Sequence, residues 1–261
     1  MLNKNSEVST VPDLKQLLII CPLVFLAGFV DAIGGGGGLI SLPAYLIAGL
    51  PPHQAIATNK LSATCGTALA TARFARQGFI KWRFALPAMA AAVVGAWGGA
   101  HLSLLVSSDV LSKILYVILP VTAVLVLRKG TFRETPAGDI SERKAALIAA
   151  VSALVIGVYD GFYGPGTGTF LIIAFSLLAH MDVRTANGLC KAINLTTNVT
   201  SLLVFLRSGQ ALIALGLSAA VCNMLGGWLG AGMALRAGAK ITRPIILLVL
   251  VLLALKVIGL F

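Results

Sequence analysis

Gly28-Phe-Val-Asp-Ala-Ile-Gly-Gly-Gly-Gly-Gly38 is the stretch that decides the fold, because a related stretch recurs in the second half of the chain. The second copy reads Gly157-Val-Tyr-Asp-Gly-Phe-Tyr-Gly-Pro-Gly-Thr-Gly168. The offset is 129 residues at the aspartates, 130 at the glycines and 131 at the lysines that follow, Lys60 and Lys191. It persists further on, where residues 95–100 match residues 226–231. A duplicated apolar unit whose second element opens on glycines is typical of secondary transporters, in which the ligand binds where the two repeats meet.

The composition excludes the soluble classes of protein. The chain has 261 residues, 58% of them hydrophobic and 11% charged, and its mean hydropathy is +0.95. A water-soluble fold of this size would lack polar residues for its surface. The net charge of +11 does not indicate nucleic-acid binding, because the basic residues occur in short turns between apolar segments. We therefore expect a membrane protein with lipid as its surroundings and no nucleic-acid partner.

Ten apolar segments predict an all-α integral membrane protein with two repeats of about five segments each. The second and seventh segments are too short to cross the hydrocarbon as straight helices, since crossing takes roughly 20 residues. They are half-helices, re-entrant turns or tilted short spans. We expect these glycine-initiated helices to meet near the midplane, where irregular backbone is tolerated inside protein or against a cavity. The segments span residues 15–33, 38–50, 55–73, 83–106, 110–127, 144–160, 166–180, 185–206, 211–235 and 243–261.

The distribution of Lys and Arg predicts the topology. If all ten segments cross, 13 basic residues fall on one side, and the other side keeps only Lys4, Lys15, Lys113 and Arg207. The positive-inside rule then favours ten crossings with both termini outside, and five segments per repeat make the repeats inverted. We expect a first transmembrane repeat at 1–127, a cytoplasmic linker at 128–144 and a second repeat at 145–261.

Lys60 and Lys191 are the first candidates for ligand binding. A cationic side chain within an apolar segment is costly in the bilayer, so it usually faces a cavity or a charged partner. The two lysines hold matching positions, which favours anion binding, but they could instead reach an interface or pair with Asp31 or Asp160. These two aspartates are the only acids well inside apolar sequence. They could carry protons or hold the glycine turns in place, and the sequence leaves both roles open.

The glycine runs and the neighbouring polar residues complete the candidate substrate site. Glycine permits a sharp turn just before a helix begins, and a helix N-terminus favours negative charge. Asn187, Lys191, Asn194 and Asn198 are three or four residues apart and share a helix face. Such a polar stripe suggests a lined cavity. The predicted substrate-binding residues are Gly36, Gly37, Gly38, Thr58, Asn59, Lys60, Gly166, Thr167, Gly168, Asn187, Lys191, Asn194 and Asn198.

These motifs resemble a known family. Residues 28–41, Ala57-Thr-Asn-Lys60 and Asp160-Gly-Phe-Tyr-Gly-Pro-Gly-Thr-Gly168 look like the signatures of the sulfite exporter TauE/SafE family of bacterial transporters. The resemblance covers nearly the whole chain and implies an inner-membrane carrier of a small sulfur-containing anion such as sulfite, sulfoacetate or thiosulfate, with export favoured. The chain departs from the family at Ala186 to Lys191, where a Thr commonly precedes the lysine.

Other functional classes have less support. No HExxH or GxSxG motif is present, and the three histidines lie at segment ends, so we expect no enzyme, no metal site and no cofactor. The cysteines lack CxxC spacing, and we expect them to be buried apolar residues. A small-anion channel stays open as the alternative to a carrier. The sequence also leaves open the coupling ion and the oligomeric state, a homodimer included.

Overall fold

The computed structural model describes residues 12–111, 140–238, 240–242 and 244–245. Within these ranges the chain is helical and contains no strand. Most of the predicted segments 5 and 10 and most of the predicted linker lie outside the described residues. The eight helices are α1 (Leu14–Gly34), α2 (Gly38–Ile47), α3 (Pro52–Arg76), α4 (Trp82–Leu105), α6 (Glu142–Phe162), α7 (Thr167–Leu177), α8 (Val183–Arg207) and α9 (Ile213–Ala237).

Local sequence explains where the helices begin and end. The carboxylate of Asp182 caps α8 by accepting hydrogen bonds from the backbone N–H groups of Arg184 and Thr185, both at 3.1 Å. Pro52 opens α3 at a position where its missing N–H costs no helical bond. Gly35 ends α1 in the left-handed conformation at φ 79° and donates to the carbonyl of Asp31.

Five of the described helices are long and apolar enough to cross a membrane: α1, α4, α6, α8 and α9. Helix α3 is as long as α8 and α9, with 25 residues, but its mean hydropathy is too low for this group because polar residues occupy its first half. Helices α2 and α7 have 10 and 11 residues. At about 1.5 Å per residue they cover about half of a hydrocarbon core of about 30 Å. The expectation that segments 2 and 7 are short is therefore confirmed.

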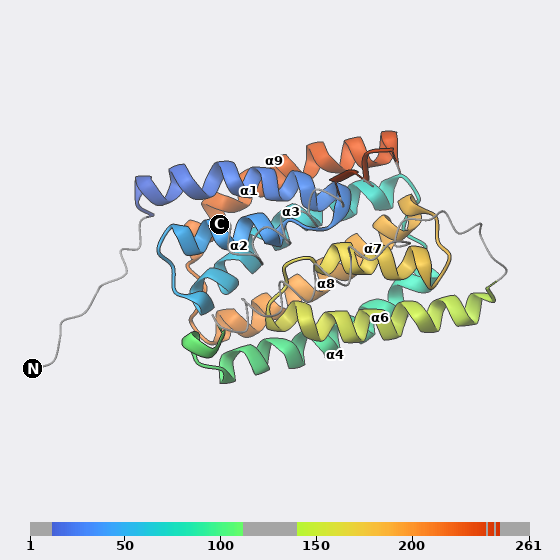
Figure 1. Ribbon diagram of the computed structural model, residues 1–261, viewed down its shortest axis with the longest axis horizontal. Coiled ribbons are helices and arrows are strands. Elements are labelled where there is room, and N and C mark those ends of the chain that lie inside the picture. The colour runs from blue at the N-terminus through green and yellow to red at the C-terminus, as the bar shows by residue number, and fades with distance from the viewer. Residues whose placement is uncertain (1–11, 112–139, 239, 243, 246–261) are drawn as a thin grey trace, which may run out of the picture.

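The long helices form two tight pairs on opposite edges of the molecule. In Figure 1, α1 lies beside α9 along one edge and α4 beside α6 along the other, with α3, α8 and the two short helices between them. Glycines allow the backbones of each pair to touch: a Cβ at Gly226 would lie 2.0 Å from the carbonyl O of Phe25, and one at Gly99 would lie 2.0 Å from that of Val158. These are small-residue helix interfaces of the kind that membranes favour.

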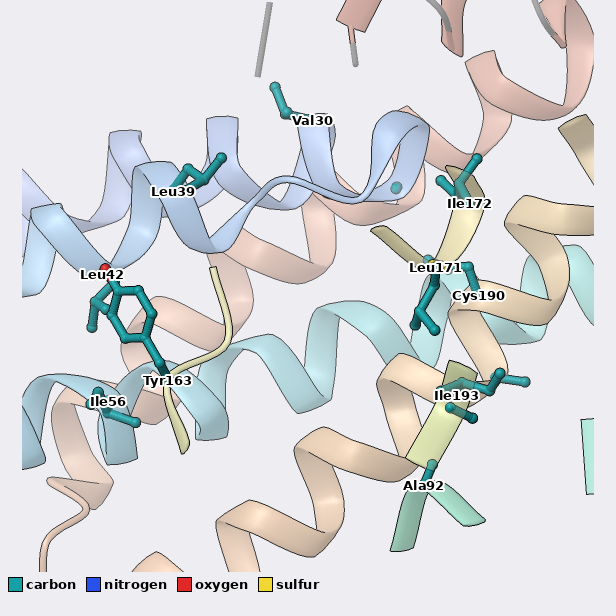
Figure 2. Packing of buried hydrophobic residues seen from close by; sticks show 14 of the residues in the cluster. Val30, Leu39, Leu42, Ile56, Ala92, Tyr163, Leu171, Ile172, Cys190 and Ile193 are labelled. Atoms are coloured by element: carbon teal, nitrogen blue, oxygen red, sulfur yellow. The ribbon is translucent and has the colours of Figure 1, made fainter. Parts of the chain in front are cut away.

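Apolar side chains fill the space around the two short helices. Figure 2 shows Leu39, Leu42, Ile56 and Tyr163 near α2, and a second group that includes Leu171, Ile172 and Ile193 near α7. Tyr163 is 2% exposed although it lies in the turn between α6 and α7. The two glycine turns, at residues 34–38 and 164–168, are therefore surrounded by packed side chains, which fixes the starts of α2 and α7.

Basic residues gather at one end of the bundle. The loop between α3 and α4 contacts the start of α8, because a Cβ at Gly188 would lie 2.4 Å from the carbonyl O of Phe79. At the same end, Arg184 donates to the carbonyl of Arg236. Arg83, at the start of α4, pairs with Glu142, at the start of α6. Both of these side chains are largely exposed, so the pair contributes little to stability.

Candidate functional site

The two glycine turns lie directly against each other. The backbone N–H of Thr169 donates to the carbonyl of Gly35 at 3.0 Å, and the Thr169 hydroxyl donates to the carbonyl of Gly34 at 2.8 Å. A Cβ at Gly35 would lie 2.2 Å from the backbone carbon of Gly168. Glycine is therefore required at Gly35 both by its positive φ and by the close approach of the second turn.

Two buried ion pairs cross between the halves of the chain. Lys60 Nζ lies 2.9 Å from Asp160 Oδ2, and Lys191 Nζ lies 2.9 Å from Asp31 Oδ2. The side chains of the first pair are 3% and 4% exposed, while Lys191 is fully buried and Asp31 is 21% exposed. Each lysine thus neutralises the aspartate of the other half, so neither is an isolated cation.

The aspartates also contact the turns that follow them. Asp31 Oδ1 accepts from the backbone N–H of Gly37 at 3.3 Å, and Asp160 Oδ1 accepts from the hydroxyl of Thr167 at 2.9 Å. Lys191 additionally donates to the backbone carbonyl of Asp31. Pairing with lysine and anchoring of the glycine turns, two of the roles that the sequence leaves open, therefore occur together.

A small polar cavity lies where the two turns meet. Its volume is about 40 Å³, which gives room for roughly three or four water molecules. Helices α1, α2, α3, α6, α7, α8 and α9 all contribute to its wall. Eleven of the candidate residues line it: Asp31, Gly37, Gly38, Asn59, Lys60, Asp160, Gly166, Thr167, Gly168, Asn194 and Asn198.

Four candidates do not line the cavity: Gly36, Thr58, Asn187 and Lys191. Three of these have contacts that support the framework. The Thr58 hydroxyl accepts from the backbone N–H of Leu212 at 3.1 Å. The amide of Asn187 donates to the carbonyls of Ala32 and Ile33 at 3.2 and 3.0 Å. Asn187 thus satisfies two carbonyls in the last turn of α1, which an α-helix leaves without intrahelical partners, and Lys191 donates to the carbonyl of Asp31, which also accepts from Gly35.

Seven further residues line the cavity and are not among the candidates predicted from the sequence: Ala27, Gly35, Ser41, Ala63, Thr67, Gly164 and Asn223. Gly35 and Gly164 belong to the two glycine runs. Asn223 had a signal of its own, since it is the single amide side chain in the apolar sequence of α9. Ser41 and Thr67 lacked such a signal, because hydroxyl residues are common in apolar helices.

The cavity combines one ammonium group, two helix starts and several amides. The starts of α2 and α7 bring N–H groups that have no intrahelical partner to its wall. Lys60 also donates to Asn198 Oδ1 at 3.1 Å, and Asn59 Oδ1 is buried without a hydrogen-bond partner among the described residues. These groups can bind a small anion, since helix N-termini and ammonium groups both favour negative charge. Among the residues with described positions, no group of three His, Cys, Asp or Glu could hold a metal ion.

Comparison with known proteins gives several full-length relatives. The chain is 37% identical over 238 residues to the probable membrane transporter protein ORF9 of Sinorhizobium sp., covering 90% of this chain and 89% of the relative. It is 34% identical over 244 residues to the probable membrane transporter protein YfcA of Escherichia coli K12, covering 90% of both chains. A probable membrane transporter protein of Haemophilus influenzae is also 34% identical, over 89% of this chain and 90% of the relative.

No solved structure matches the chain. The family model described as sulfite exporter TauE/SafE matches residues 20–257, which include both glycine turns and both buried ion pairs. With the relatives and the apolar helices, this match indicates a multi-pass membrane protein and confirms the resemblance seen in the sequence. The chain belongs to the sulfite exporter TauE/SafE family.

Proposed function

We propose that the protein is a secondary transporter that exports a small sulfur-containing anion, such as sulfite, sulfoacetate or thiosulfate, across the bacterial inner membrane. The family and the names of the relatives support membrane transport and no enzymatic activity. The observation that carries the proposal is the cavity between the two glycine turns, with Lys60 and the starts of α2 and α7 in its wall. Its small volume suits an anion of few heavy atoms.

The two halves are proposed to be inverted repeats around this cavity. Under the sequence offsets, α1 corresponds to α6 and α4 to α9, so the pairs α1–α9 and α4–α6 are equivalent to each other. The exchanged ion pairs fit the same relation, because exchanging the halves converts Lys60–Asp160 into Lys191–Asp31. A site enclosed by two such repeats can open alternately to either side when the repeats move against each other.

In this proposal the anion competes with Asp160 for the ammonium group of Lys60. The ion pair leaves the site electrically balanced, so the extra attraction for the anion comes from the helix starts and from the amides. An inside-negative potential favours outward movement of an anion by about 2.3 kcal/mol per charge per 100 mV. Export therefore needs no co-transported ion.

Counterflow in proteoliposomes tests the proposal against the alternative of a small-anion channel. Vesicles loaded with unlabelled sulfite should accumulate labelled sulfite transiently above its external concentration, because a carrier exchanges substrate through one alternating site. Empty liposomes and protein-containing vesicles without internal sulfite serve as controls. Equilibration without overshoot would favour the channel, and no flux of sulfite, sulfoacetate or thiosulfate would contradict the substrate class.

A further inference from the structure

Asn223 on α9 has a position that helix packing does not explain. Its side chain lies in the wall of the cavity and is 6% exposed. It makes no hydrogen bond with any residue in the described parts of the chain. The side chain faces a cavity that has room for several water molecules, so the partner of its amide is a cavity water or a bound ligand that replaces this water.

Two glycines on other helices make room for this side chain. A Cβ at Gly66 of α3 would lie 1.9 Å from Asn223 Oδ1, and a Cβ at Gly28 of α1 would lie 2.7 Å from the same atom. Any other residue at either position would displace the amide. The backbones of α1 and α3 thus leave space for a polar group that bonds to neither of them.

The equivalent helix pair, α4 with α6, has no counterpart of this arrangement. The offset of 131 residues that relates Gly95 to Gly226 places Ala92 at the position equivalent to Asn223. Ala92 packs less tightly against Gly157, since a Cβ at Gly157 would lie 3.3 Å from the carbonyl O of Ala92 and 3.4 Å from its Cα. The amide therefore does not follow from the duplicated packing, and it makes the cavity different on the side of α9.

Asn223 also lies away from the ion pair of Lys60 with Asp160. Helix α3 contributes Lys60, Ala63 and Thr67 to the wall, and the rise of a helix separates the first and last of these by about 10 Å along the axis. Gly66, which contacts Asn223, precedes Thr67 directly. Thr67 is 5% exposed and likewise makes no hydrogen bond to the described residues.

We infer that Asn223 is a ligand-binding residue, which donates its amide N–H groups to an oxygen of the bound oxyanion on the side of the cavity remote from Lys60. This assignment rests on the proposed function for the class of ligand. It makes recognition asymmetric: one side of the anion meets the ammonium group and the helix starts, and the other side meets an uncharged amide supplied by α9.

The test replaces Asn223 with leucine, which is similar in size and keeps the contacts with Gly28 and Gly66 while it removes the amide. The thermal unfolding midpoint of the purified full-length protein is measured in detergent over a sulfite titration. We expect the ligand-free midpoint of Asn223→Leu to equal or exceed that of wild type, because the change breaks no hydrogen bond to another residue in the described parts of the chain. The sulfite concentration that gives half of the maximal stabilisation should rise about tenfold or more.

Two matched controls accompany this variant. Asn187→Leu removes an amide whose NH2 group donates to the carbonyls of Ala32 and Ile33, so it should lower the ligand-free midpoint. Ser218→Ala changes an exposed hydroxyl of α9 that bonds within its own helix, so it should leave both the midpoint and the titration unchanged. Asn223→Ala provides a second removal of the amide with a smaller side chain.

The outcomes separate this inference from the proposed function. Wild-type titration curves in both Asn223 variants would overturn the inference and leave the proposed function intact. A ligand-free midpoint in Asn223→Leu that falls as far as in Asn187→Leu would also overturn it, since the amide would then be structural. If sulfite, sulfoacetate and thiosulfate all fail to stabilise wild type, the proposed substrate class fails. The ligand-free midpoint of Asn223→Leu then decides whether the amide is structural. A midpoint equal to that of wild type supports a role of Asn223 in binding a ligand of another class.

Discussion

Lys60 and Lys191 hold equivalent places in the sequence but have different surroundings. Lys60 reaches the wall of the cavity, where it contacts Asp160 and Asn198. Lys191 is fully buried behind the cavity, and it contacts both the carboxylate and the backbone carbonyl of Asp31. The sequence predicts a ligand role for both lysines, and the geometry gives Lys60 the direct access that such a role requires.

Lys60→Gln should abolish stabilisation by sulfite. Glutamine keeps a polar side chain of similar reach but removes the charge that offsets desolvation of the anion. The measurement is the shift of the unfolding midpoint with sulfite, and Lys60→Arg serves as a variant that keeps the charge. Wild-type stabilisation in Lys60→Gln would show that the lysine serves only its ion pair with Asp160.

Lys191→Gln should instead destabilise the protein without ligand. Breaking a buried ion pair by removing one partner typically costs about 3–5 kcal/mol, because the other charge stays uncompensated. The partial exposure of Asp31 places the expected loss at the lower end of that range. Denaturant unfolding of Lys191→Gln, Asp31→Asn and the double variant measures the coupling. Additive losses in the double variant would contradict a structural ion pair.

At the scale of elements, the contact between the starts of α2 and α7 depends on glycines that meet backbone to backbone. Gly35→Ala should disrupt this contact and reduce sulfite-induced stabilisation, because a Cβ there collides with Gly168. Gly78→Ala is a matched control: its φ of 75° is close to the 79° of Gly35, but its Cβ would meet no described atom within 4 Å. Both variants carry the same backbone strain.

Differential scanning calorimetry of Gly35→Ala and Gly78→Ala separates the effect of backbone strain from that of the collision with Gly168. The midpoint of Gly35→Ala should fall clearly below that of Gly78→Ala. Equal midpoints would show that the turns can separate without cost and that their contact does not shape the site.

Local patterns predicted the elements well. The glycine runs, the short second and seventh segments and the polar face of α8 could all be read from residues close together in the chain. The pairing of Lys60 with Asp160, and of Lys191 with Asp31, could not be assigned, because it depends on how helices more than a hundred residues apart pack. Asn223 stands out in the sequence as the single amide of α9, but its place between Gly28 and Gly66 could not be predicted, because these glycines lie on two other helices.

At the scale of the whole molecule, the chain directions place the loops at opposite ends of the bundle. The loop after α3 lies at the end where the basic residues gather, beside the start of α8. Helix α8 begins at that end and runs the length of the molecule, so the loop that follows it lies at the other end (Figure 1). The membrane orientation proposed for the inverted repeats puts the first loop in the cytoplasm and the second in the periplasm.

Single cysteines at Gln77 and Ser208, in a variant without the four native cysteines, should therefore react from opposite sides with an impermeant maleimide. Intact cells should label Ser208→Cys, and inverted vesicles should label Gln77→Cys. A cysteine at Lys15 should behave like the one at Ser208 and provides an internal standard. Labelling of positions 77 and 208 from the same side would contradict inverted repeats.

The exchanged ion pairs have a consequence for biogenesis. When the first half has left the ribosome, Asp31 and Lys60 are already in the membrane, but their partners Asp160 and Lys191 have not yet been synthesised. Each half thus carries one acid and one base that only the other half compensates, so a half produced alone should be a substrate for membrane proteases. Two halves synthesised as separate polypeptides in one cell should rescue each other, since the charges that make each one unstable are those that join them.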